Sequence, residues 1–164
     1  MKVLKNTSIL CCLLFCFLSV FAQARPVKST LSYLYVLSAK SATLSHISQH
    51  GFQLTLHHVD SHILRFTDRP NRKAGLISTN HFLQNWAVNF KNVPPNIALV
   101  HVNMMFDEKG EQQPAAMELS HPQIKHNEIT FVASKLKGYP LSPGKLLAPR
   151  LFIDSLGNLV PNEW

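Results

Sequence analysis

Apolar and polar residues alternate over most of the chain, and a period of two is the signature of a strand with one buried face. The pattern is clearest at Phe52, Leu54 and Leu56, which alternate with polar neighbours. Strands are predicted at residues 31–44, 52–57, 62–66, 97–106, 113–120, 129–134 and 151–154. One face of the strand at 97–106 would carry Ala98, Val100, Val102, Met104 and Phe106.

Residues 107–110 read as a type I turn with Gly110 in the left-handed conformation, which would close a hairpin between two of these strands. Residues 78–90 break the alternation and predict a helix. Their aromatic residues recur every four positions: Phe82, Trp86 and Phe90. Ser78 or Thr79 is placed to cap this helix, and the apolar stripe is expected to face the core rather than form a ligand groove.

Seven or eight short strands with one helix, and without the strand–helix alternation of parallel sheets, indicate antiparallel layers. The predicted fold is mostly β, an antiparallel β-sandwich with one inserted amphipathic helix, and an open β-barrel is the alternative. Residues 25–164 would form a single domain, with the proline-rich residues 138–164 as an extension packed on its surface.

The first 24 residues have the pattern of a signal peptide. Lys2 and Lys5 precede an apolar run at residues 9–21, and the small residues Ala22 and Ala24 mark a cleavage site before Arg25. The run is short for a permanent membrane span, so no transmembrane segment is expected after cleavage.

Cleavage changes the composition that bears on function. All three cysteines lie within the removed segment, so thiolate metal sites and thiol catalysis are excluded. Loss of Lys2 and Lys5 lowers the formal charge from +7 to +5. A basic protein is attracted to anionic surfaces. No basic stripe interleaves with aromatic residues, so nucleic acid is not an expected partner.

The stretch FTDRPNRKAG, residues 66–75, is strongly polar and lies between apolar runs. Asp68 and Pro70 fit a turn that the fold requires. A turn does not require guanidinium groups, which bind carboxylate, phosphate or sulfate in a bidentate manner. The candidate ligand-binding residues are Asp68, Arg69, Arg72 and Lys73. The alternative is an Arg–Asp68 ion pair that only stabilises the loop.

Nine histidines are present, and the string HHVDSH contains His57, His58 and His62. Hairpin pairing could bring two of them together as ligands for zinc or copper. Adjacent strand residues point to opposite faces, so His57 and His58 cannot both bind one ion. A third ligand would have to come from elsewhere, and the alternative is a set of surface histidines without a cofactor.

Hydrolase and zincin motifs are absent from the sequence, which favours a non-enzymatic protein. Two motifs resemble those of a family of small exported bacterial proteins of unknown function: F-[ST]-D-R-P-x-R-x-x-G from Phe66, and PPN-x-AL at residues 94–99. Some members are similar to type II secretion substrates of Gram-negative bacteria that live inside host cells. The resemblance implies export and a β-rich fold, and it supplies no catalytic residue.

The expected function is therefore that of a secreted, effector-type binding protein connected with virulence. It would leave the cell through Sec and then type II secretion, with the secretion machinery as a partner. It would recognise a host or envelope ligand through the loop at residues 68–73. A histidine-dependent metal-binding protein or metalloenzyme is the second hypothesis, and a periplasmic structural or accessory protein is the third.

Overall fold

The computed structural model describes residues 32–48, 51–67, 71–90, 93–104, 110, 114–137 and 141–155. Within these ranges the chain forms nine strands and two short helices. The first half contains β1 (Tyr33–His46), β2 (Gly51–Val59), β3 (His62–Thr67), β4 (Ala74–Ser78), α2 (Thr79–Gln84) and α3 (Trp86–Phe90). The second half contains β5 (Asn96–Val100), β6 (Ala115–Lys125), β7 (Glu128–Lys135), β8 (Gly144–Leu147) and β9 (Arg150–Asp154).

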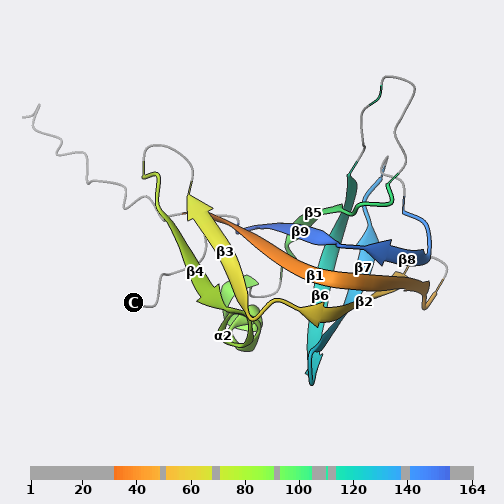
Figure 1. Cartoon of the computed structure of the whole chain (residues 1–164), viewed down its shortest axis with the longest axis horizontal. Coiled ribbons are helices and arrows are strands. Elements are labelled where there is room, and N and C mark those ends of the chain that lie inside the picture. The colour runs from red at the N-terminus through yellow and green to blue at the C-terminus, as the bar shows by residue number, and fades with distance from the viewer. Residues whose placement is uncertain are drawn as a thin grey trace, which may run out of the picture.

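All nine strands belong to one antiparallel sheet with the order β2-β7-β6-β5-β9-β1-β3-β4, and β8 pairs with β1 (Figure 1). The mostly antiparallel β fold with an inserted helical segment is confirmed. The layers on the two sides of the core are joined into one sheet because β1 is long enough to have two partners on each edge. One edge pairs with β3 and then β2, and the other pairs with β9 and then β8.

The bending of this sheet is visible as a change in the burial pattern of β1. Odd-numbered residues from Tyr33 to Ala39 are buried, but beyond Lys40 the buried residues are Ala42 and Leu44. The neighbouring strands carry left-handed residues at the same level, His58 at φ 54° in β2 and Ala148 at φ 45° between β8 and β9. One extra residue in a strand shifts its inward face and increases its twist. This irregularity lets one sheet enclose the core.

The helical segment covers the core as predicted but is shorter and broken. Phe82, Trp86 and Phe90 are all buried, with the Phe82 ring 4.7 Å from that of Tyr35 and the Trp86 ring 5.3 Å from that of Phe131. Ser78 occupies the N-cap position as predicted but makes no side-chain cap, and the hydroxyl of Thr79 donates to the Asp60 carbonyl at 2.6 Å. That hydrogen bond ties the start of α2 to the β2–β3 turn.

The face assigned to the strand at 97–106 was also wrong. Its buried residues are Ile97 and Leu99, whereas Val102 is 71% exposed. The strand ends at Val100 because the chain then turns, and the Val102 amide donates to the carbonyl of Leu147 at 2.9 Å. Most of the predicted turn at residues 107–110 lies outside the described residues, but Gly110 has the expected positive φ, 76°.

The chain after Gly138 is more than a surface extension. The predicted strand at 151–154 forms as β9, between β5 and β1, and β8 forms beside it along β1. Leu146, Leu151 and Ile153 are buried in the core. The end of β9 is attached to the start of β1, where the Tyr33 amide donates to the Ser155 hydroxyl at 2.7 Å. Residues 1–24, which are predicted to be a signal peptide, lie outside the described residues.

Candidate functional site

The predicted binding loop lies at the tip of a hairpin formed by β3 and β4, at one end of the sheet (Figure 1). The strand β4 was not predicted; a turn leading directly to the helix was expected. Two hydrogen bonds close the loop. The Thr67 amide donates to the Lys73 carbonyl at 2.8 Å, and the Lys73 amide donates to the Thr67 hydroxyl at 2.9 Å. The loop is therefore held at both ends by its own residues.

Two of the four candidate residues in this loop can be placed. Arg72 and Lys73 are exposed, and Asp68 and Arg69 lie outside the described residues. Arg72 has a left-handed backbone, with φ 46°, and Gly75 lies in the strand β4. Among the described residues the ion pair that forms is His57–Glu128, and no described carboxylate neutralises Arg72 or Lys73. Asp68, the predicted alternative partner of the arginines, lies outside the described residues.

The strand β3 contains a buried cation close to the loop. Arg65 is 9% exposed, and its guanidinium carbon lies 5.1 Å from the centroid of the Tyr33 ring. Burial raises the pKa of Tyr35 to about 12, although the charge of Arg65 and its hydrogen bond oppose the rise. Arg65 is thus part of the scaffold beneath the loop. Its position between Ile63 and Thr67 in a period-two pattern was the signal that it points inward.

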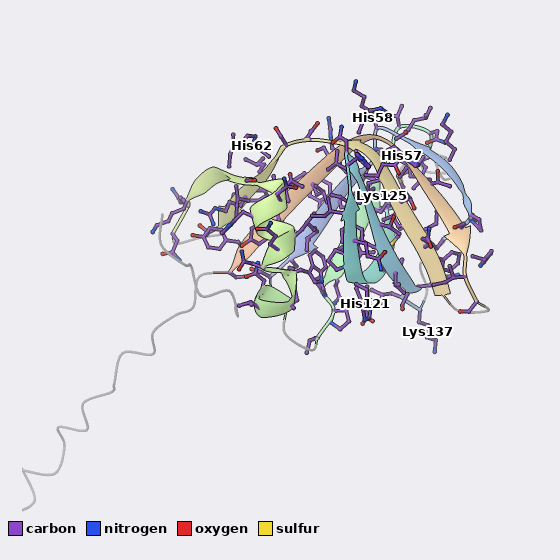
Figure 2. The ribbon with its side chains drawn as sticks, turned by 90° about the horizontal axis from the view of Figure 1, so that it is seen from below. His57, His58, His62, His121, Lys125 and Lys137 are labelled. Carbon is purple, nitrogen blue, oxygen red and sulfur yellow. The ribbon has the colours of Figure 1, made fainter. Side chains whose placement is uncertain are left out.

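The three candidate metal ligands have different surroundings in the structure. His57 uses both ring nitrogens: Nδ1 lies 2.7 Å from Oε1 of Glu128, and Nε2 lies 3.0 Å from the Thr43 hydroxyl. His57 therefore links β2 to β1 and β7. His62 contacts the Ser61 hydroxyl at 3.0 Å through Nδ1. His57, His58 and Lys125 lie near one another in Figure 2, and His62 lies apart from them.

His58 faces a shallow hollow of about 280 Å³ at the β6–β7 turn, lined by His58, Lys125, His126, Asn127 and Glu128. The backbones of His58 and His126 are both left-handed, with φ 54° and 55°. Within the described ranges, no group of three histidine, cysteine, aspartate or glutamate side chains is placed to hold a metal ion. The described histidines therefore offer surface and cross-strand contacts.

The aromatic stripe of the helical segment lies beside a groove. Its rings are nearly closed to solvent, with Trp86 6% and Phe90 8% exposed. A groove of about 490 Å³ runs beside them, between α3 and the bulge in β6 at His121. The rings mainly contact one another and Phe131, with Trp86 and Phe90 centroids 4.5 Å apart, so their first role is in the core.

No known protein family, curated protein or solved structure matches this chain. None of the helices in the described ranges is long and apolar enough to cross a bilayer. The site must therefore be interpreted from its own chemistry.

Proposed function

We propose that the chain is an exported, non-enzymatic binding protein that recognises an anionic ligand through the basic loop at the tip of the β3–β4 hairpin. The observation that supports this proposal is the exposure of Arg72 and Lys73 without a described acidic neighbour. The ligand class is a carboxylate, phosphate or sulfate on a host or envelope surface. The activity is recognition, and no step of bond making or breaking is proposed.

The local geometry is suited to binding a charged surface. Arg72 and Lys73 are exposed and directly precede β4, and β3 and β4 lie at one end of the sheet (Figure 1). The Thr67–Lys73 hydrogen bonds fix the distance between the two ends of the loop. The loop therefore loses less conformational entropy on ligand binding than a loop with unattached ends would lose.

Export through Sec and type II secretion is the second part of the proposal. It is supported by the signal-peptide pattern of residues 1–24 and by the resemblance at residues 66–75 and 94–99. A secreted protein with a net positive charge would meet lipopolysaccharide, anionic phospholipids and acidic glycans. These share the chemistry that guanidinium and ammonium groups bind.

A vesicle-binding assay tests the ligand class. The exported chain would be mixed with phosphatidylcholine vesicles that contain or lack phosphatidylglycerol, and separately with heparin. The double variant Arg72→Gln/Lys73→Gln should bind anionic vesicles about tenfold or more weakly, because each basic residue near such a surface contributes about 1 kcal/mol. Heparin separates an acidic-glycan ligand from a lipid headgroup.

The matched control is Lys135→Gln/Lys137→Gln, which removes the same charge from exposed residues at the end of β7. Lys137 lies at the other side of the molecule from the hairpin (Figure 2). Equal losses in the two double variants would mean that net charge, and not the loop, drives binding. Fractionation of producing cells with and without type II secretion tests the export route, and retention in the periplasm in both strains would contradict it.

A further inference from the structure

The strand β4 ends the sheet, and the hydrogen bonds at both ends of the β3–β4 ladder show which of its backbone groups face outward. The Thr67 amide donates to the Lys73 carbonyl, and the Thr79 amide donates to the Ser61 carbonyl. Antiparallel ladders alternate bonded and non-bonded pairs. Gly75 and Ile77 therefore bond to β3, whereas the backbone groups of Ala74, Leu76 and Ser78 point away from it. Among the described residues no strand pairs with this edge.

An apolar row crosses the outer face of the sheet and ends at this edge. The register aligns one residue from each of five strands, in the order Ala98, Phe152, Val36, Leu64 and Leu76. Exposure increases toward the edge. Phe152 and Val36 are half-buried by their neighbours, Leu64 is 43% exposed, and Leu76 is 63% exposed. Leu76 is the residue of the row that lacks a neighbour on one side.

The sequence of β4 carries none of the features that usually block sheet edges. Proteins protect edge strands with lysine, proline, bulges or a covering segment. The strand reads AGLIS, with no charge and no proline, and its nearest basic residue is Lys73, just before it. An extended strand with an apolar residue opposite Leu76 would fit this edge.

We propose that the edge pairs with β4 of a second copy of the chain, antiparallel and centred on Leu76. In this register the amide and carbonyl of Leu76 bond to those of Leu76 in the second copy, and the Ser78 amide donates to the Ala74 carbonyl. The two Leu76 side chains then contact each other and continue the apolar row across the interface. Cross-strand apolar contacts of this kind stabilise paired strands.

The charges near the edge are compatible with this register. The paired strands end at Ala74 and Ser78, and Lys73 of one copy follows at the level of Thr79, the first residue of α2 in the other copy, so no two cations face each other. A two-fold axis through Leu76 makes the contact isologous and closed, so the assembly stops at a dimer. The two basic loops lie at opposite ends of the joined strands. The contact involves a strand of only five residues in each copy, so a dimer that dissociates on dilution is expected.

Sedimentation velocity of the exported chain over a concentration series tests the proposal. We expect a reversible monomer–dimer equilibrium. Leu76→Lys should raise the dissociation constant of the dimer at least tenfold, because it places two ammonium groups opposite each other at the two-fold axis. The side chain at 76 is mostly exposed, so this variant should retain the melting temperature of the parent.

Leu147→Lys is the matched control. It adds the same charge at an apolar residue of β8 that is 45% exposed, on a different edge of the sheet. This variant should dimerise like the parent protein. A parent chain that remains monomeric at every concentration would overturn the proposal. So would a dimer that persists in Leu76→Lys, or one that both lysine variants weaken equally. These outcomes do not depend on whether the loop binds anions.

Discussion

Two strands of similar length, β8 and β4, each pair with one other strand among the described residues, and their second edges differ. At β8 the side chain of Asn103 completes the ladder. Its Oδ1 accepts from the Leu147 amide at 3.0 Å, and its Nδ2 donates to the Lys145 carbonyl at 3.0 Å. The Val102 amide donates to the Leu147 carbonyl at 2.9 Å. At β4, no described residue makes the corresponding bonds.

The difference shows that the closure of a sheet edge is a property of the neighbouring segment, not of the strand. A carboxamide carries one acceptor and two donors, so Asn103 can imitate a peptide group of an adjacent strand. It does so because the chain leaves β5 at Val100 and passes beside β8. Nothing comparable passes beside β4 among the described residues. The end of the sheet that contains β4 is supported by α2, which follows β4 directly and whose Phe82 is fully buried against Tyr35.

Removing that support should produce the largest effect. Phe82→Ala empties a fully buried site that contacts Tyr35, Trp86 and Phe90. We expect a loss of about 3–5 kcal/mol in the free energy of unfolding, measured by urea denaturation. Val88→Ala, at a residue of α3 that is 65% exposed, should cost less than about 0.5 kcal/mol. Similar losses in both variants would mean that Phe82 is not part of the core.

High pH should lower the free energy of unfolding through Tyr35, which lies in the part of β1 that pairs with β3. Because the pKa of Tyr35 is raised from 10.0 to about 12 in the fold, the folded state holds this proton more tightly than the unfolded state. The stability that this provides is fully present below pH 10 and is lost as the pH rises through 12, by an amount on the order of 2 kcal/mol. Melting temperatures between pH 9 and pH 12 measure this change. Tyr35→Phe should have a flatter profile, and an unchanged profile would contradict the assignment.

Removing the Asn103 hydrogen bonds that close the edge of β8 should have a smaller effect on the free energy of unfolding. Asn103→Ala removes two hydrogen bonds to β8 and should cost about 1 kcal/mol, because water replaces the lost partners at this exposed site. Asn103→Asp keeps the acceptor for the Leu147 amide and loses the donor to Lys145. Its amide exchange at Leu147 should stay close to that of the parent. Equal protection of Leu147 in Asn103→Ala would show that Asn103 does not close the edge.

The smallest stability change is expected at the hairpin tip. Arg72 has φ 46°, and a left-handed conformation costs an L-residue about 1–2 kcal/mol, whereas glycine adopts it freely. Arg72→Gly should therefore unfold at the same temperature as the parent or a few degrees above it. The same variant should bind anionic vesicles less tightly. A large fall in the melting temperature would mean that Arg72 is structural and would contradict its role as a ligand contact.

Alternation of apolar residues was sufficient to locate β1, β2, β3, β7 and β9, because each has one face against the core. The alternation did not locate strands that have little or no face buried against the core. The strand β4 has no buried residue, and β8 has only Leu146, so neither shows the pattern. The face of β5 was reversed because both of its faces are apolar. Asn103 closes an edge through partners more than forty residues away, which no local pattern predicts.

The candidate binding loop was chosen from its charge, and its role in binding stays a prediction. The density of charged residues identified the loop that contains Arg72 and Lys73. Charged residues that the fold does not require are found mainly in exposed loops. The same reasoning did not place Arg65, whose charge is buried beside two tyrosines. The histidine string was proposed as a metal site from its composition. The strand pairing that places His57 between Thr43 and Glu128 depends on residues far away in the sequence.

The central claim is that one sheet edge is closed and another is open, and amide hydrogen exchange at Leu147 and Leu76 tests it most directly. In dilute solution the Leu147 amide should be protected and the Leu76 amide should exchange rapidly. Raising the protein concentration should slow exchange at Leu76 and leave Leu147 unchanged. A Leu76 amide that is protected at every dilution would show that the β4 edge is already covered and would contradict the account.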